Sequence, residues 1–261
     1  MQALNIAATG MQAQELNVEV IANNIANMRT TGFKRQRAEF QDLLYQNLKR
    51  VGTTSGADGS VVPSGIQVGV GVKTGSTYRI MTQGNMINTE KPLDVGIRGE
   101  GFYQISMPDG TITFSRDGAF ALNATGTLVN QEGFSIDGDI TVPADALSVT
   151  INAEGVVEVT LAGAAAPTQV GQIQLARFVN TAGLEAIGDN LYRETAASGT
   201  PTVGNPGTDG TGSLLQYFLE ESNVNAVAEI SDLIMAQRAY EMNSKVISAA
   251  DEMMRTTSNL R

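Results

Sequence analysis

The chain of 261 residues contains no cysteine, no histidine and no tryptophan. Without cysteine it can form neither disulfide bonds nor thiolate metal sites, and without histidine it lacks the commonest general base and metal ligand. Aromatic residues make up only 5% of the chain, which argues against a ligand pocket lined with rings. We therefore expect a protein that is not an enzyme, with no catalytic residues, no cofactor and no bound metal ion.

An excess of basic residues is also missing, because the formal net charge is −10. A protein that binds nucleic acid by neutralising phosphates needs a basic face. Residues 29–50 are locally basic, with six Lys and Arg side chains against two Glu and Asp, a charge of +4 that leaves −14 for the remainder. Because few aromatic residues accompany these charges, we expect a solvated or subunit-contacting surface here rather than a nucleic-acid site.

Long hydrophobic runs are absent as well. No stretch approaches the ~18 apolar residues that cross a membrane as a helix, so we expect no membrane insertion. No Lys or Arg precedes Arg29, and Asn5, Thr9 and Gln12 interrupt any apolar core of a signal peptide. We therefore expect no cleaved signal peptide, and either a cytoplasmic location or export by a route that does not read one.

What the chain does contain is a long helical pattern between Asn225 and Leu260, with no Pro or Gly to interrupt it. The pattern predicts one helix of about 36 residues and roughly 50 Å. One row of apolar or small residues at steps of three and four is Met235, Ala239, Met242, Val246, Ala249, Met253, Thr256 and Leu260. A second row beside it is Leu233, Ala236, Tyr240, Asn243, Ile247, Ala250 and Met254. Two adjacent rows form a stripe that is too wide for a single neighbouring helix.

A second helical pattern occupies the first 28 residues. Its row of residues at steps of three and four is Leu4, Ala7, Met11, Gln14, Val18, Ile21, Ile25 and Met28. The only charged side chains between Met1 and Met28 are Glu15 and Glu19, so a free helix of this kind would be poorly soluble. The core of a helical bundle would explain the pattern, but the sequence between the two terminal helices is not helical, and we favour burial between subunits.

We therefore predict that the two terminal helices pair with each other and with neighbouring subunits. Candidate N-caps of the C-terminal helix are Ser222, Asn223 and Asn225. The residues predicted to form the subunit interface are Leu4, Met11, Val18, Ile21, Ile25, Leu233, Tyr240, Met242, Val246, Ile247, Met253, Met254 and Leu260.

The sequence between the helices predicts antiparallel β structure. Residues 66–72 alternate between β-branched residues and small or polar ones, which is typical of a strand, and residues 214–219 predict another. From about residue 82 to 178, turn signals recur roughly every eight to twelve residues, as in an antiparallel β domain. Residues 49–65 and 196–212 are rich in Gly, Ser and Thr and predict loops or linkers at the surface.

Two motifs that could carry chemistry are weak. Gly69-Val70-Gly71 resembles part of a dinucleotide-binding loop, but a third Gly is misplaced and the following residues predict a strand rather than a helix. Asp137, Asp139 and Asp145 lack the further ligands of a calcium loop, and a catalytic pair of carboxylates would need a proximity that sequence does not show. We interpret these aspartates as residues that cap turns.

A specific motif follows the N-terminal helix. Asn23 to Asn27, then Thr30, Gly32-Phe33-Lys34 and Phe40 at fixed spacing, resemble the signature of the bacterial flagellar rod and hook family. The residues assigned to this signature are Asn24, Ile25, Ala26, Asn27, Thr30, Gly32, Phe33 and Lys34. Other segments that agree with the family in order and spacing are 82–85, 94–97, 99–103, 115–120, 126–129, 221–224, 237–241 and 243–245. Residues 63–72 look like the distal-rod branch of that family.

The resemblance implies a structural subunit of the flagellar distal rod, which polymerises into a hollow drive shaft that transmits motor torque and conducts exported subunits. It implies an α+β fold in which long N- and C-terminal helices form a coiled-coil domain around an inserted antiparallel β-rich region. The implied domains are residues 1–30 with 222–261 (coiled coil), 31–90 with 205–221 (β-rich connecting domain with a flexible insertion at 49–65) and 91–204 (outer antiparallel β domain).

The resemblance also implies partners and a location. The partners are further copies in a helical tube, proximal rod and hook subunits at its ends, and the surrounding ring proteins. The location is the periplasmic rod of the basal body, reached through the flagellar type III export apparatus. A proximal rod or hook subunit of the same family is one alternative, and a peptidoglycan-acting enzyme and a secreted adhesin are alternatives of other classes.

Overall fold

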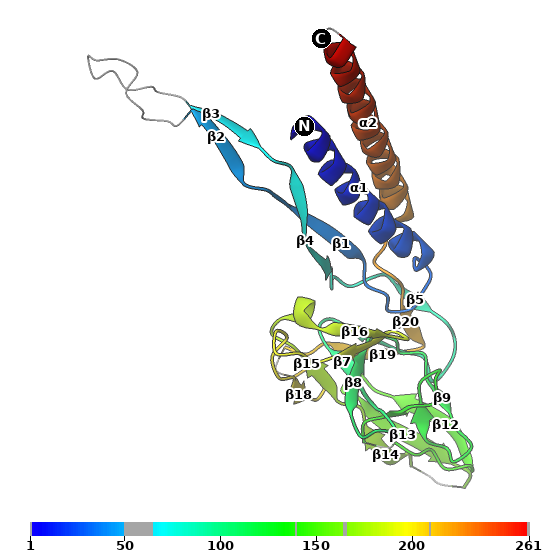
Figure 1. The fold of residues 1–261 in the computed structure, drawn as a ribbon. Helices are drawn as coiled ribbons and strands as arrows, with labels where there is room; N and C mark the ends of the chain where they lie inside the picture. The colour runs from blue at the N-terminus through cyan, green and yellow to red at the C-terminus, as the bar shows by residue number, and fades with distance from the viewer. Residues whose placement is uncertain (1, 50–64, 139, 164–165, 209, 260–261) are drawn as a thin grey trace. The chain divides into compact units, whose positions relative to one another are not determined.

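The computed structural model describes the chain except for residues 1, 50–64, 139, 164–165, 209 and 260–261. One long helix lies near each end of the sequence, with strands between them (Figure 1). This arrangement confirms the predicted α+β class, with terminal helices around an antiparallel β-rich region. The chain divides into two compact units, which we call the helical unit (Met1–Ile25, Gln36–Tyr78 and Asn225–Arg261) and the β unit (Ala26–Arg35 and Arg79–Val224). The predicted division into three domains stays a prediction.

The helical unit contains both long helices. Its elements are α1 (Gln2–Ala26), β1 (Gln36–Asp42), β2 (Tyr45–Lys49), β3 (Ile66–Gly69), β4 (Val72–Arg79) and α2 (Ala226–Asn259). Asn225 caps α2, because its side-chain oxygen accepts hydrogen bonds from the backbone N–H groups of Val227 (3.1 Å) and Ala228 (3.2 Å). α1 ends at Ala26, two residues before the end of the predicted helical pattern. The Thr30 hydroxyl donates to Asn27 Oδ1 (3.2 Å), a local hydrogen bond that favours turns over helix.

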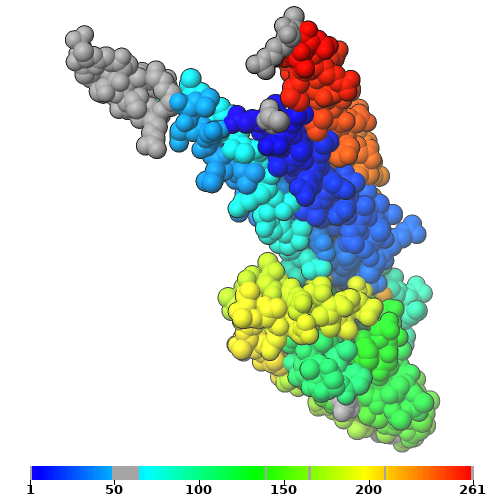
Figure 2. Space-filling model, in the orientation of Figure 1, coloured from blue at the N-terminus to red at the C-terminus, as the bar shows by residue number. Residues whose placement is uncertain are grey.

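The strands of the helical unit form two pairs. β2 pairs antiparallel with β3, with Tyr45 opposite Gly69, and β1 pairs with β4. The strand predicted over residues 66–72 is interrupted, because Gly71 has a φ of +135° and separates β3 from β4. The backbone N–H of Val72 then donates to Thr9 Oγ1 (3.4 Å), so the strands lie along α1 (Figure 2). The loop predicted at 49–65 lies mostly outside the described residues.

The β unit is built from short strands. Its elements are β5 (Met86–Asn88), β6 (Val95–Arg98), β7 (Phe102–Ser106), β8 (Ile112–Ser115), β9 (Ala121–Leu122), β10 (Leu128–Val129), β11 (Ser135–Ile136), β12 (Ala146–Ile151), β13 (Val156–Leu161), β14 (Thr168–Gln172), β15 (Leu175–Arg177), η1 (Thr181–Gly183), β16 (Glu185–Gly188), β17 (Leu191–Arg193), β18 (Thr202–Gly204), β19 (Ser213–Gln216) and β20 (Phe218–Glu220). The largest sheet runs β16-β17-β8-β7-β11-β10-β9, with β15 joined to β7 and β18 to β15. A second sheet is β12-β13-β14, β6 pairs with β19, and β5 pairs with β20.

The central strand β7 buries both of its faces. Tyr103 and Ile105 point into the main hydrophobic cluster, whereas Phe102 points into a second, aromatic cluster, because successive side chains of a strand alternate between faces. In the aromatic cluster Phe102 and Phe114 each meet Phe178 edge to face, with ring centroids 5.8 and 4.8 Å apart. The β unit is therefore a complete folded body with its own core.

Two predictions of local structure need correction. The loop predicted over residues 196–212 contains β18, whose backbone hydrogen bonds are satisfied by pairing with β15, and local sequence does not show this pairing. The strand predicted over 214–219 is divided into β19 and β20, because Tyr217 adopts a φ of +69° between them. Within the described part of the chain, neither long helix combines the length and apolar character that a membrane span requires.

Candidate assembly interface

The part of the signature from Ala26 to Lys34 folds within the β unit against β20, the strand that precedes α2. Gly32 has a φ of +67°, and its N–H donates to the backbone oxygen of Glu220 (2.8 Å). A Cβ at position 32 would lie 2.9 Å from the carbonyl carbon of Arg116. Only glycine combines this backbone conformation with so close an approach, which explains the Gly of the signature.

A buried charge cluster of Lys34, Arg116 and Glu220 lies beside this contact. Lys34 Nζ is 2.6 Å from Glu220 Oε1, and Arg116 Nη2 is 3.1 Å from Glu220 Oε2. Lys34 Nζ also donates to Thr82 O (3.0 Å), and the N–H of Gly84 donates to Glu220 Oε1 (2.8 Å). Burial lowers the pKa of Lys34, and the positive charge of Arg116 lowers it further, while Glu220 opposes both effects. The charge cluster thus joins the signature segment to β20.

Asn223 fastens the same part of the β unit. Its Oδ1 accepts a hydrogen bond from the N–H of Arg35 (2.7 Å), and its Nδ2 donates to the backbone oxygens of Ile80 (2.7 Å) and Thr82 (3.0 Å). Arg35 is the residue before β1, and Asn223 stands just before the cap of α2. Two places at which the chain leaves the β unit, one for β1 and one for α2, are therefore held side by side.

Within the helical unit, Asn24 joins three elements. Its Oδ1 accepts from the N–H of Gln36 (2.8 Å), and its Nδ2 donates to the backbone oxygen of Gln36 (2.9 Å) and to Glu229 Oε2 (3.0 Å). Asn24 belongs to α1, Gln36 begins β1 and Glu229 lies in the first turn of α2. A buried, fully engaged Asn of this kind sets the register of the elements that it joins, because any slip leaves its polar atoms unsatisfied.

The contact between Asn24 and Glu229 is one end of a seam between α1 and α2. The seam continues at Gly10, where a Cβ would lie 2.9 Å from Asn243 Nδ2. From the first contact to the second, the position on α1 moves back by two repeats of seven residues, from Asn24 to Gly10, while the position on α2 moves forward by the same number, from Glu229 to Asn243. The two helices therefore run antiparallel. Residues in this register are Ala3, Gly10, Asn17 and Asn24 on α1, and Glu229, Ala236, Asn243 and Ala250 on α2. All of them are small or polar, so the larger apolar side chains lie outside the seam.

Three segments of the chain match sequence profiles of flagellar families. Residues 4–34 match "Flagella basal body rod protein", residues 96–159 match "Flagellar hook protein FlgE/F/G D1 domain" and residues 215–260 match "Flagellar basal body rod FlgEFG protein C-terminal". Over its whole length, the chain is 58% identical to the flagellar basal-body rod protein FlgG of Caulobacter vibrioides, with 100% of both chains covered. The chain belongs to the FlgG family of flagellar basal-body rod proteins.

Other relatives of this FlgG-family chain agree. FlgG of Agrobacterium fabrum is 53% identical over 97% of each chain, and FlgF of Caulobacter vibrioides is 34% identical over 97% of this chain and 95% of the relative. The predicted resemblance to the rod family, and within it to the distal rod protein, is confirmed. The protein is a structural subunit of the flagellar rod in the basal body, and it is not an enzyme.

The residues predicted as subunit contacts of this rod subunit fall into groups of different exposure. Ile21 is buried inside the helical unit. Half-buried residues are Leu4, Met11, Val18, Ile25, Leu233 and Ile247. Exposed residues are Tyr240, Met242, Val246, Met253 and Met254, and Leu260 lies outside the described residues. Their role between subunits stays a prediction. The exposed members of the set are accessible to a neighbouring subunit.

The signature residues are divided in the same way. Asn24, Gly32 and Lys34 are buried and make the contacts described above, Ile25, Asn27, Thr30 and Phe33 are half-buried, and Ala26 is exposed. Sequence reasoning missed their partners Glu220 and Glu229, because no local pattern marks either glutamate. The signal that existed was indirect, since a lysine or asparagine buried in a fold requires a polar partner.

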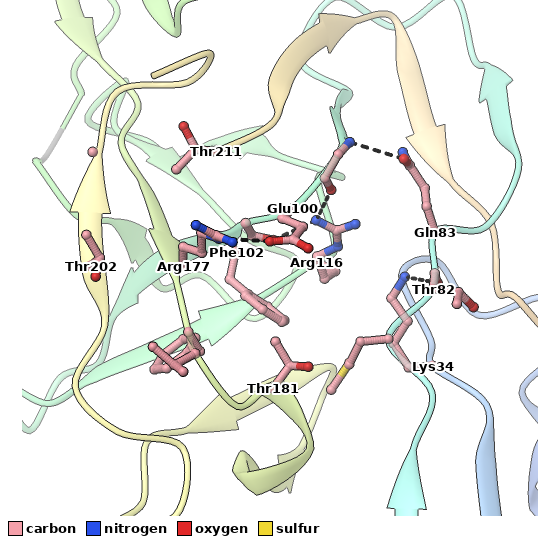
Figure 3. A pocket seen from close by; sticks show the side chains of 16 residues that line it. Lys34, Thr82, Gln83, Glu100, Phe102, Arg116, Arg177, Thr181, Thr202 and Thr211 are labelled. Atoms are coloured by element: carbon pink, nitrogen blue, oxygen red, sulfur yellow. Dashed lines mark hydrogen bonds and ion pairs between the residues drawn. The ribbon is translucent and has the colours of Figure 1, made fainter. Parts of the chain in front are cut away.

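The β unit also contains a cavity of about 530 Å³ beside the charge cluster (Figure 3). Phe102 lines it together with three cationic side chains, of which Lys34 and Arg116 belong to the charge cluster. The third, Arg177, has its Nε 2.8 Å from Glu100 Oε2. The charged groups around the cavity thus already bind one another across chain segments. In the part of the chain that the structure describes, no three acidic side chains are grouped as metal ligands.

Proposed function

We propose that this rod subunit polymerises into a hollow helical tube, and that this tube is the distal rod, the shaft that carries the torque of the flagellar motor. The observation that supports the proposal most directly is a row of exposed apolar side chains on α2. Met235, Met242, Val246 and Met253 are 60%, 60%, 47% and 63% exposed. A monomer gains nothing from such a row in water, whereas burial of each side chain against another copy contributes up to about 1.5–3 kcal/mol.

In the tube, α1 and α2 of successive copies form coiled-coil contacts around a central channel that conducts exported subunits. The seven-residue spacing of the α1–α2 seam supports this, because coiled coils repeat with that period. Residues 1–30 with 222–261 act as the coiled-coil domain, 31–90 with 205–221 as the connecting domain, and 91–204 as the outer domain. Torque passes along the shaft through many lateral contacts, with no chemical step.

The proposal includes the route of assembly and the neighbours of the tube. The chain travels unfolded through the flagellar type III export apparatus and assembles in the periplasmic part of the basal body. The absence of cysteine supports this route, since no disulfide can form in an exported chain before it assembles. Proximal rod and hook subunits contact the two ends of the tube, and ring proteins surround it.

Charge placed on the exposed row tests the proposal. We expect that the full-length double variant Met235→Glu with Met242→Glu restores no swimming to a strain that lacks the natural subunit. The purified variant should need at least a tenfold higher concentration than the unmodified chain to self-associate in sedimentation. Ser248→Glu, on an exposed polar position of the same helix, is the matched control and should swim normally. A double variant that swims like the control contradicts the proposed use of this row.

The position along the rod needs a separate measurement. Electron microscopy of isolated basal bodies, with a label fused to an exposed turn of the β unit such as the one at Gly110, should place the subunit between the hook and the inner part of the rod. A label confined to the inner end would instead assign the chain to the proximal rod.

A further inference from the structure

The seam between α1 and α2 has an apolar row on each helix directly beside it. On α1, each seam position from Ala3 onwards is followed by a large apolar residue, and these residues form the α1 row: Leu4, Met11, Val18 and Ile25. On α2, Met235 and Met242 each stand one residue before a seam position, and Val246 and Met253 stand three residues after one. The residues of the α2 row are therefore Met235, Met242, Val246 and Met253.

These two rows lie on opposite faces of the helix pair. One residue corresponds to a rotation of about 100° around a helix, so the α1 row is turned about +100° from the seam. The α2 row is turned by about −100° to −60°, since three residues forward are equivalent to about −60°. In a parallel pair such opposite rotations would bring both rows to one face. Because α1 and α2 run antiparallel, the sense of rotation is reversed on one helix, and the rows face apart.

The remaining positions beside the seam confirm the distinction between the two faces. Thr9 stands one residue before the seam position Gly10 on α1. Its Oγ1 accepts a hydrogen bond from the backbone N–H of Val72. The strands therefore cover α1 on the same face of the helix pair as the α2 row. One residue after the seam on α2 stand Gln237, Ser244 and Asp251, which are polar and exposed. Each face of the helix pair therefore carries one of the two rows, the half-buried α1 row on one face and the exposed α2 row on the other, and the two rows belong to different helices.

We infer that the α1 row of one copy receives the α2 row of the next copy. This inference rests on the proposed function and names the surface that meets the exposed row. A contact between two different surfaces on opposite faces is heterologous, so it leaves a free row at each end and continues into an open helical assembly instead of closing as a dimer.

Charge supports the same pairing. The only charged side chains of α1 are Glu15 and Glu19, and both are exposed. Arg238 and Lys245 stand three residues after Met235 and Met242, at the edge of the α2 row, and both are exposed. Contact between α1 and α2 of different copies brings opposite charges close, whereas contact between two copies of α1 would bring four carboxylates together.

Blocking one row at a time distinguishes this arrangement from a symmetric contact. The variants are full-length Val18→Glu, which blocks the α1 row, and Met242→Glu, which blocks the α2 row. The control is Ser248→Glu, an exposed position on the side of α2 that faces away from the seam and from both rows. At a concentration at which the control forms multimers, we expect each blocked variant alone to sediment as a monomer. An equimolar mixture should give a species of twice the monomer mass and nothing larger, because each variant retains the row that the other has lost.

Other outcomes overturn the inference. A dimer of either blocked variant alone would mean that like rows meet, and a mixture that stays monomeric would mean that the rows do not meet at all. If the control and the unmodified chain themselves never associate, the proposed function fails first. Far-UV circular dichroism at the native helix content confirms that each variant is folded.

The absence of cysteine permits a second measurement that introduces no charge. We expect that a full-length chain with both Val18→Cys and Met242→Cys, treated with a short bismaleimide, gives a ladder of cross-linked multimers in a denaturing gel. Chains with only one of these substitutions should give no ladder and no dimer. Dimers from Val18→Cys alone or from Met242→Cys alone would contradict the heterologous contact.

Discussion

The β unit and the helical unit of this rod subunit differ in where they keep their large apolar side chains. Tyr103 and Leu175 of the β unit are completely buried, whereas Val227 and Met242 of α2 are 75% and 60% exposed. The helix pair buries mainly small or polar residues along its seam, such as Ala236. Hydrophobic stabilisation therefore resides mainly in the β unit, whereas the helical unit buries few large apolar side chains, such as Ile21, and keeps others exposed. In one chain, the stably packed β unit is thus separate from the surface that we propose for assembly.

A valine at Gly118 is expected to have the largest effect, because it breaks the β unit itself. A Cβ at this position would lie 1.7 Å from the backbone oxygen of Val95, which is fixed in the core. We expect a loss of about 4 kcal/mol or more in the free energy of unfolding, seen as loss of the near-UV circular dichroism of the tyrosines. Gly110→Ala, where φ is +81° and the space is open, should cost only about 1–2 kcal/mol. If both variants lose the same free energy of unfolding, the backbone around Gly118 is not tightly packed.

Removal of the carboxylate from the charge cluster should have the next largest effect. Glu220→Ala leaves Lys34 and Arg116 buried without their partner, and we expect a loss of about 3–5 kcal/mol in urea unfolding. The matched control is Glu100→Ala, which removes an ion pair with Arg177 at the surface and should cost about 0–1 kcal/mol. If the two variants unfold at the same urea concentration, the charge cluster does not hold the segments of the β unit together.

Asn24→Ala should destabilise the helical unit and leave the stability of the β unit unchanged. It removes hydrogen bonds to both backbone groups of Gln36 and to Glu229, and we expect about 2 kcal/mol of destabilisation confined to the helical unit. Hydrogen exchange should accelerate in α1 and α2 while the β-unit amides keep their protection. Asn5→Ala, at an exposed position of α1, is the control and should change neither. Faster exchange in the β unit to the same extent would mean that the two units unfold as one.

The smallest effect is expected at Tyr103, whose hydroxyl donates to the backbone oxygen of Val95 (2.6 Å). Tyr103→Phe should cost about 1 kcal/mol at neutral pH. Burial raises the pKa of Tyr103 well above its ordinary value of 10.0, with a partial offset from Arg116. A raised folded-state pKa contributes stability that is complete below pH 10.0 and is lost as the pH rises through that folded-state pKa.

Urea titrations at increasing alkaline pH test this dependence. The stability of the natural chain should fall more steeply above pH 10.0 than that of Tyr103→Phe. Tyr240→Phe, on the exposed surface of α2, should follow the natural chain. If the free energy of unfolding falls with pH at the same rate in all three proteins, Tyr103 does not contribute to the alkaline destabilisation of the β unit.

Much of the fold follows from patterns within single segments. The uninterrupted helical period from residue 226 onwards is enough to predict α2, and Asn225, one of three candidate caps, does cap it. Closely spaced turn signals are likewise enough to predict an antiparallel β region. The errors occur where a segment takes its hydrogen bonds from elsewhere, as β18 does from β15, or where one residue such as Gly71 or Tyr217 turns the backbone.

The choice of partners could be read only in three dimensions. The two apolar rows of the C-terminal helix are equivalent as sequence, yet contact with α1 buries Ala236 in one and leaves Met242 of the other exposed. Lys34 requires a buried carboxylate, but Glu220 stands 186 positions away and nothing around it marks the pair. A period is a property of one segment, whereas a partner is selected by the free energy of packing all segments together. For this reason the helices and the family could be predicted, and the seam and the charge cluster could not.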